Sequence, residues 1–251
     1  MNAETVERAP RRYGMVIDLD RCSGCGACMV ACSAENNVPP AHPQATERTG
    51  ITLLRVVQVK DAASRGVAFI PMMCQQCGDD TPCMTVCPQQ AVEVDKLTGV
   101  VEQMPQRCLG CRYCMTACPF QARFFNWWDP EWPAGMETTL NPGAAPRMRG
   151  VVEKCDFCQS RMHAAEDKAA MEGSREFEYT PACVEACPTR AIVFGDLNDP
   201  ESDVSRQARN SFRFLERLGT GPKVYYRSRR PWLRTLASRV GAPPKKENGN
   251  G

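Results

Sequence analysis

The sixteen cysteines of this 251-residue chain constrain its fold more than any other feature. They fall into four groups of four, with none left over. In chain order the groups are Cys22, Cys25, Cys28, Cys32; Cys74, Cys77, Cys83, Cys87; Cys108, Cys111, Cys114, Cys118; and Cys155, Cys158, Cys183, Cys187. The first and third groups have the spacing C-x2-C-x2-C-x3-C, whereas the middle gap is five residues in the second group and 24 in the fourth.

This spacing favours cubane iron–sulfur clusters. One short loop with cysteines at intervals of three can surround three corners of a 4Fe–4S cube, and the fourth cysteine of the run then binds a second cluster. Small residues between the ligands, such as Gly24 and Gly110, let backbone N–H groups approach the sulfurs. Structural zinc prefers two C-x-x-C pairs separated by a longer stretch. Nothing in the sequence marks an oxidising compartment, so a disulfide framework is the poorer alternative.

Internal repeats support the same interpretation. The segment "RCSGCGAC" at 21–28 recurs as "RCLGCRYC" at 107–114, and "PCMTVCPQQAVEVD" at 82–95 recurs as "PACVEACPTRAIVFGD" at 181–196. Proline follows the fourth cysteine in three groups and should end the short helix that carries it. Ser33 replaces this proline in the first group, so we expect that helix to continue toward Pro39.

The segments between the groups indicate how the groups pair. Residues 88–107 contain an alternating run, a D-K-L-T-G turn and a second run, which is typical of strand, turn and strand. The second and third groups therefore form one compact module, and the first and fourth form the other. The fourth cysteine required by the first group is then Cys187.

The four-group pattern over roughly residues 13–200 resembles the four-cluster ferredoxin-type subunits of the complex iron–sulfur molybdoenzymes, such as dimethyl sulfoxide, polysulfide, tetrathionate and arsenate reductases. In that family each cluster takes three cysteines from one group and one from its partner group. The resemblance implies four 4Fe–4S clusters with these ligands: cluster 1, Cys22, Cys25, Cys28 and Cys187; cluster 2, Cys74, Cys77, Cys83 and Cys118; cluster 3, Cys87, Cys108, Cys111 and Cys114; cluster 4, Cys32, Cys155, Cys158 and Cys183.

The expected fold class is α+β, with two nested bacterial-ferredoxin-like modules and loop insertions. Residues 11–40 and 150–200 form the expected outer module, and residues 69–124 form the inner one. The remaining expected parts are connecting inserts at 41–68 and 125–149 and a C-terminal extension with a basic tail at 201–251.

The expected function is electron transfer without catalysis. No Ser/His/Asp set or phosphate-binding glycine loop is present. The resemblance implies two partners, a molybdopterin-containing catalytic subunit and an integral membrane quinone-reactive subunit, and no nucleic acid. We expect no signal peptide and no transmembrane segment in the chain, and a peripheral position on the cytoplasmic membrane through a partner subunit. The alternatives are a free soluble polyferredoxin and a zinc-binding interaction module.

The C-terminal segment has a different charge from the rest of the chain. Eight Lys or Arg and no acidic residue lie between Lys223 and Lys246, and without them and Glu247 the net charge of +2 becomes −5. Trp232, Leu233, Leu236 and Val240 could share one helical face. We expect the start of this segment to dock against a partner subunit or lipid headgroups, with disorder from about residue 242, and the clusters to need nothing from it. A wholly disordered basic tail is the alternative.

Overall fold

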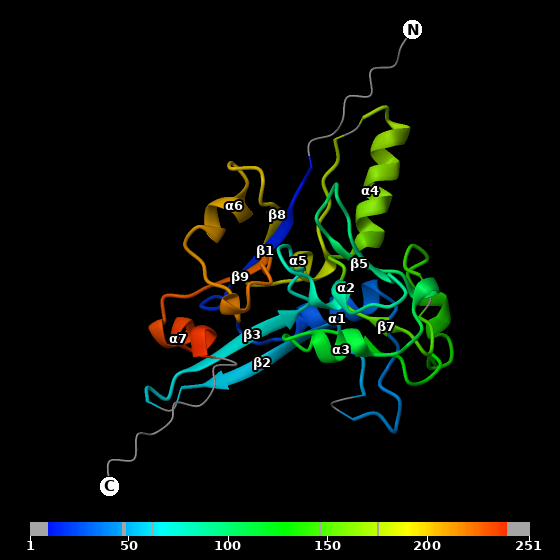
Figure 1. The fold of residues 1–251 in the computed structure, drawn as a ribbon, viewed down its shortest axis with the longest axis horizontal. Coiled ribbons are helices and arrows are strands. Elements are labelled where there is room, and N and C mark those ends of the chain that lie inside the picture. The colour runs from blue at the N-terminus through cyan, green and yellow to red at the C-terminus, as the bar shows by residue number, and fades with distance from the viewer. Residues whose placement is uncertain (1–9, 47–48, 62, 146, 175, 240–251) are drawn as a thin grey trace.

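The computed structural model describes residues 10–46, 49–61, 63–145, 147–174 and 176–239, which form helices and small sheets (Figure 1). This arrangement confirms the expected α+β class. The strands are β1 (Tyr13–Asp18), β2 (Leu54–Lys60), β3 (Val67–Met73), β4 (Val92–Val94), β5 (Val101–Gln103), β6 (Phe124–Phe125), β7 (Val152–Glu153), β8 (Ile192–Asp196) and β9 (Val224–Arg227). The helices are α1 (Ala27–Glu35), α2 (Pro82–Thr85), α3 (Tyr113–Ala117), α4 (Gln159–Met171), α5 (Ala182–Glu185), α6 (Asp203–Ala208) and α7 (Pro231–Arg239), with short 3-10 turns η1 (Pro105–Arg107), η2 (Met136–Thr139) and η3 (Glu216–Leu218).

A three-stranded sheet joins distant parts of the chain. Strand β1 lies in its centre, antiparallel to β8 and parallel to β9. Met15, Val16 and Ile17 of β1 are fully buried because both faces of this strand are covered. The sheet therefore brings the segment before the first cysteine group beside the segment after the fourth group.

A hairpin connects the second and third cysteine groups, as the sequence predicts. Strands β4 and β5 are antiparallel, and residues 95–100 turn between them. The Asp95 carboxylate accepts a hydrogen bond from the Leu97 amide at 2.6 Å, and the Asp95 carbonyl accepts one from the Gly99 amide at 2.8 Å. Gly99 has a φ of +68°, a conformation that costs glycine little.

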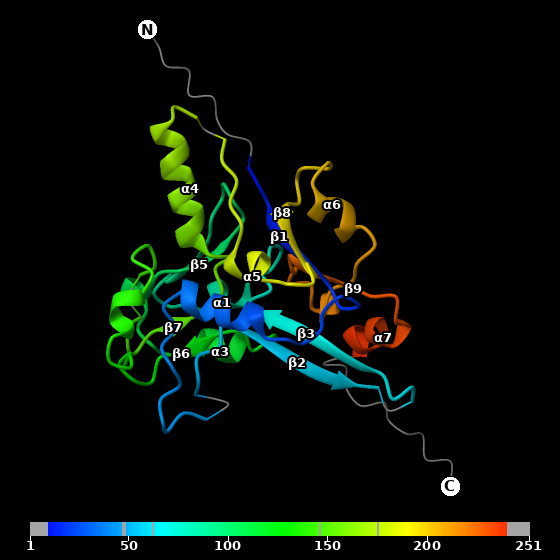
Figure 2. The same ribbon diagram turned by 180° about the vertical axis from the view of Figure 1, so that it is seen from behind.

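Helix α1, which carries Cys28 and Cys32 of the first group, is the longest of the described helices that carry cysteines. Helix α1 has nine residues, whereas α2 and α5 have four and α3 has five. This difference confirms the expectation drawn from Ser33. In Figure 2, α1 lies close to α5 at the centre of the molecule, and the two helices are in contact.

The segments between the cysteine motifs also form regular structure. Strands β2 and β3 form a seven-residue antiparallel pair that extends away from the cysteine-bearing segments toward α7 (Figures 1 and 2). Helix α4 occupies the long gap of the fourth group and ends two residues before Gly173, whose φ is +72°. Among the described residues, no helix combines the length and the apolar character that crossing a membrane requires.

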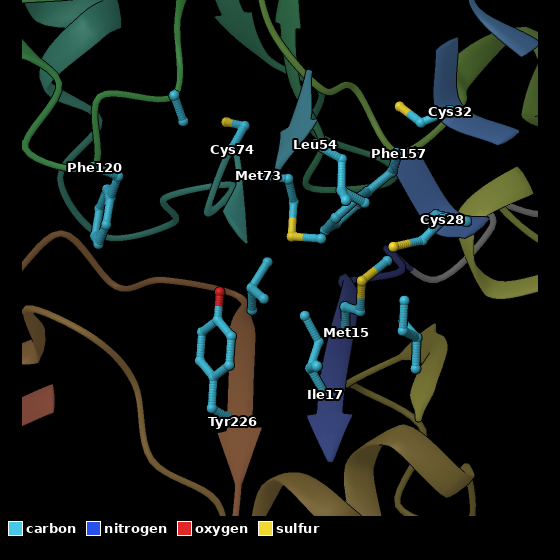
Figure 3. Close-up of a cluster of buried hydrophobic side chains, with 14 of the residues drawn as sticks. Met15, Ile17, Cys28, Cys32, Leu54, Met73, Cys74, Phe120, Phe157 and Tyr226 are labelled. Carbon is cyan, nitrogen blue, oxygen red and sulfur yellow. The ribbon is translucent and has the colours of Figure 1, made fainter. Parts of the chain in front are cut away.

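The largest apolar core lies between the sheet around β1 and the cysteine-bearing segments. Figure 3 shows Met73 and Phe157 between Cys74 and helix α1, which carries Cys28 and Cys32. Met73 and Phe157 are each 1% exposed. Thiols from both expected modules therefore line the same core.

The start of the C-terminal segment is part of this core, so the alternative of a wholly disordered basic tail is wrong for residues 223–239. Lys223 is 1% exposed, and its amide donates to the Gln75 carbonyl at 2.8 Å. Tyr226 of β9 is fully buried, and its hydroxyl contacts the Pro71 carbonyl at 3.1 Å. Leu233 is also fully buried, so the apolar face of α7 covers this chain's own core. We therefore expect the cysteine sites to depend on this segment, contrary to the expectation from the sequence. Val240 and residues 242–251 lie outside the described residues.

Candidate metal-binding site

The fold gathers the sixteen cysteines into four sets of four. In set 1 the thiols of Cys22, Cys25, Cys28 and Cys187 interact electrostatically with one another. In set 2 Cys74, Cys77, Cys83 and Cys118 line one cavity. In set 3 Cys87, Cys108, Cys111 and Cys114 line another cavity. In set 4 the interacting thiols are those of Cys32, Cys155, Cys158 and Cys183. Each set takes three cysteines from one sequence group and one from another.

Every group uses the same local backbone geometry between its first two cysteines. The residue directly before the second cysteine has a left-handed conformation in all four groups: Gly24 (φ +75°), Gln76 (+51°), Gly110 (+70°) and Phe157 (+60°). This reversal bends the chain so that successive thiols face a common space. At Gly110 the amide also donates to the Cys108 sulfur at 3.4 Å.

The proline-containing groups share a second device that brings an amide to a sulfur. In the pattern C-P-x-x-A, the residue before alanine has a positive φ: Gln90 (+48°), Gln121 (+49°) and Arg190 (+49°). The alanine amide then points back at the cysteine. Ala91 donates to the Cys87 sulfur and Ala191 to the Cys187 sulfur, each at 3.2 Å, and the Ala122 amide hydrogen-bonds to Cys118. Such hydrogen bonds stabilise a thiolate.

The first group lacks this turn, and a side chain replaces it. The Asn36 amide nitrogen lies 3.8 Å from the Cys32 sulfur, 4.0 Å from the Cys158 sulfur and 2.9 Å from the Cys32 carbonyl oxygen. Asn36 is only 5% exposed. The sequence analysis did not identify Asn36. Its position four residues after Cys32, directly after the last residue of the lengthened helix α1, could have indicated a contact with that cysteine.

The pKa values of the thiols reflect burial. Burial, with smaller effects of neighbouring thiols, raises the pKa of Cys28 to about 11 and that of Cys77 to about 12. The pKa values of Cys32, Cys155 and Cys183 are raised for the same reason. Exposed Cys25 differs, because hydrogen bonds from the Ala27 amide and the Ser23 hydroxyl lower its pKa. Four thiolates in such surroundings require a cationic centre to offset their mutual repulsion.

The donor set fits a cubane iron–sulfur cluster. Each set offers four thiols, the number that a 4Fe–4S core binds, together with amide donors directed at sulfur. In the described part of the chain, no three His, Cys, Asp or Glu side chains come together closely enough to hold a single metal ion. A cubane spaces its thiolates more widely than one ion does, because each thiolate binds a different iron.

The four sets lie in a definite order. Set 1 adjoins set 4, since the Cys28 and Cys183 thiols interact. Set 4 adjoins set 2 through buried Gln76, whose amide donates to the Cys155 carbonyl at 2.8 Å and whose oxygen accepts from the Val101 amide at 2.7 Å. Set 2 adjoins set 3, because Cys83 and Cys114 lie in one small apolar cluster with Val92, Val101 and Val152.

Family comparisons agree with this donor chemistry. Two models, each described as a 4Fe–4S dicluster domain, match residues 18–91 and 66–134. The two matched ranges contain the first three cysteine groups, and both end before Cys155. The first match spans the first and second groups consecutively, whereas the folded chain pairs the first group with the fourth.

Relatives match over most of the chain. An iron–sulfur cluster-binding subunit of menaquinone reductase from Nitratidesulfovibrio vulgaris is 49% identical over 235 residues, covering 90% of this chain and 92% of the relative. Iron–sulfur subunit 1 of an Hdr-like menaquinol oxidoreductase from Archaeoglobus fulgidus is 36% identical, covering 87% and 84%. The iron–sulfur subunit of arsenate respiratory reductase from a Shewanella species is 34% identical, covering 86% and 95%.

Proposed function

Because this chain belongs to the 4Fe–4S dicluster iron–sulfur subunits of molybdoenzyme-type oxidoreductase complexes, we propose that it holds four 4Fe–4S clusters and conducts electrons between a catalytic molybdopterin subunit and a quinone-reactive membrane subunit. It is an electron-transfer subunit and not the catalytic one. When bound, the clusters supply one-electron redox chemistry. The chain contributes thiolates, amide donors to sulfur and burial from water.

The observation that carries this proposal is the gathering of sixteen thiols into four complete sets. We assign the cluster ligands accordingly, with cluster 1 in set 1, cluster 2 in set 2, cluster 3 in set 3 and cluster 4 in set 4. The outer module then comprises residues 11–40 and 150–200, and β9 completes its sheet. The inner module comprises residues 69–124.

The order of the sets gives the proposed electron path. It runs from set 1 through sets 4 and 2 to set 3. Each terminal set has one exposed cysteine, Cys25 in set 1 and Cys111 in set 3, whereas set 4 has none. The exposed ends are where electrons would enter and leave, and partners would cover them. Through these partners the chain would lie peripherally at a membrane.

Four cysteine variants test the ligand assignment. Cys22→Ser and Cys187→Ser alter positions 165 residues apart, yet both should perturb the cluster 1 signal in EPR spectra of the reduced protein. Cys28→Ser and Cys32→Ser are the matched control, because they lie one turn apart on α1 but belong to sets 1 and 4. They should perturb different clusters. Loss of different signals in the first pair would refute the assignment.

Metal analysis and purification test the cluster number and the partners. Anaerobic protein should contain about sixteen iron and about sixteen acid-labile sulfide per chain, since each cluster contains four of each. Stoichiometric zinc, or about half the iron, would contradict the proposal. The tagged chain should copurify with a molybdenum-containing subunit, and quinol should reduce its clusters in that complex. A fully loaded monomer without partners would favour a free polyferredoxin.

A further inference from the structure

Three buried cations surround set 2. The first, Arg123, follows Ala122 of a C-P-x-x-A turn and is 4% exposed. Its Nη2 donates to the Gln103 side-chain oxygen, and its side chain also hydrogen-bonds to the Cys114 thiol. The guanidinium interacts electrostatically with the thiols of Cys83 and Cys74 in set 2 and of Cys114 in set 3. It therefore faces the junction between these two sets.

The other two cations are lysines. Lys154 is 4% exposed; its ammonium donates to the carbonyls of Val101 and Cys155, the latter at 3.0 Å, and interacts with the Cys83 thiol. Lys223 is 1% exposed; its ammonium donates to the Gly99 carbonyl and interacts with the thiols of Cys74 and Cys77. Within the described ranges, neither lysine nor Arg123 forms a salt bridge with a carboxylate. Their charges are thus available to thiolates.

Set 4 has the opposite surroundings. The Asp156 carboxylate lies within the group itself, accepts a hydrogen bond from the Cys158 amide at 3.0 Å and interacts with the thiols of Cys32 and Cys155. The Glu35 carboxylate also interacts with the Cys158 thiol, but it forms a 2.7 Å salt bridge with Arg161. Arg147 interacts with the Cys32 thiol as a partial counterweight, but it forms a 2.9 Å salt bridge with Glu153.

Resting on the proposed function, we propose that these charges divide the clusters by potential. Arg123, Lys154 and Lys223 raise the reduction potential of cluster 2, Arg123 also raises that of cluster 3, and Asp156 lowers that of cluster 4. Reduction adds one negative charge to a cluster and its four thiolates. A buried cation stabilises that added charge and a nearby carboxylate opposes it. Cluster 4, which lies between sets 1 and 2 in the proposed path, is then less readily reduced than clusters 2 and 3.

Redox titration of the purified complex, followed by EPR, tests this charge effect. Arg123→Gln should lower the reduction potentials of clusters 2 and 3. At a fixed applied potential, the ratio of reduced to oxidised cluster should fall about tenfold, which corresponds to about 59 mV for a one-electron couple. Asp156→Asn should raise the couple of cluster 4, because asparagine can accept the same amide hydrogen bond without the charge. Arg206→Gln, which removes an arginine charge from the surface of α6, is the control and should move no couple.

Each measured redox couple is assigned to a cluster by identifying which couple disappears in each cysteine variant of sets 1 and 4. Iron content and the number of EPR signals report on the proposed function, whereas the potentials report on the charges alone. If Arg123→Gln loses iron, Lys154→Gln removes a second charge from the same side and must lower the cluster 2 couple. Arg123→Lys, which keeps the charge, should stay near the wild-type potentials. Unchanged couples in iron-replete charge-removing variants, or a downward shift in Asp156→Asn, would overturn the proposal.

Discussion

Substitution of Gly110 by alanine is the sharpest test of the loop geometry at the cysteine sets. Gly110 lies between Cys108 and Cys111 with a φ of +70°. A Cβ atom there would lie 2.2 Å from the Gly150 carbonyl oxygen and 3.1 Å from the Phe125 ring. No real Cβ contact is that short, so the backbone around Gly150 would have to move.

Gly26 offers a matched control in the equivalent loop of the first group. Its φ is +78°, but a Cβ atom there would meet nothing within 4 Å. Arg112 occupies the corresponding position of the third group with a φ of +65°, so the loop accepts a side chain at this point. Gly26→Ala therefore imposes only the cost of a left-handed conformation, which is roughly 1–2 kcal/mol. Gly110→Ala adds an overpacking cost of typically 1–3 kcal/mol, for a total of about 2–5 kcal/mol.

This total is a large share of the 5–15 kcal/mol that typically stabilises a domain. We expect Gly110→Ala to lose the cluster of set 3, which is about a quarter of the iron, and to unfold at a clearly lower temperature than Gly26→Ala. Anaerobic iron analysis and thermal unfolding of the two variants, prepared in parallel, provide the comparison. Equal iron content and equal unfolding temperatures would show that the contact with Gly150 does not constrain the loop.

Three other predictions follow from the same structure. Truncation after Gly221 should prevent the protein from binding iron, because it removes β9 and buried Tyr226, whereas truncation after Arg239 should leave the iron content unchanged. A full iron content in the chain truncated after Gly221 would contradict this prediction. Asn36→Leu should lower the free energy of unfolding by about 1–3 kcal/mol, because it leaves the buried Cys32 carbonyl and two sulfurs without this donor. Thermal unfolding measures this loss, and an unchanged midpoint would contradict the prediction. Burial raises the pKa of Cys77 to about 12, so the cluster-free fold should be stabilised below about pH 9 and should lose that contribution as the pH rises toward 12. Cluster insertion should release protons and therefore become faster as the pH rises. Reconstitution rates that do not change between pH 7 and pH 9 would refute this link.

Local sequence patterns predicted the elements nearest the cysteines. The D-K-L-T-G turn lies between β4 and β5, and the missing proline at Ser33 accompanies a longer helix. In each case the signal and the structure lie within about ten residues of each other. The α+β class followed from these pieces, because repeated short helices and strands around cysteine groups leave few alternatives.

Contacts between distant segments were not predictable in this way. Strand β9 was interpreted as part of a basic tail, because Lys223 precedes it, Arg227 is its last residue, and its partner β1 lies some 200 residues earlier. Arg123 was not singled out, because arginine is almost never fully buried and its sequence neighbours do not reveal the thiols around it. A buried cation becomes recognisable only when the folded chain shows which anionic groups it faces.

The two kinds of junction between sets differ in rigidity, and this difference bears on electron transfer. Within the outer module, Cys28 and Cys32 lie on one helix, four residues and therefore about 6 Å apart along its axis. Between the modules, none of the described helices carries ligands to both sets. The junction includes Gln76, which hydrogen-bonds to the Cys155 carbonyl, and Lys154. Backbone bonds therefore fix the spacing from set 1 to set 4, whereas buried side-chain hydrogen bonds fix the spacing from set 4 to set 2. A loss of the Gln76 contacts should consequently loosen the path between modules while leaving each pair of sets within a module intact.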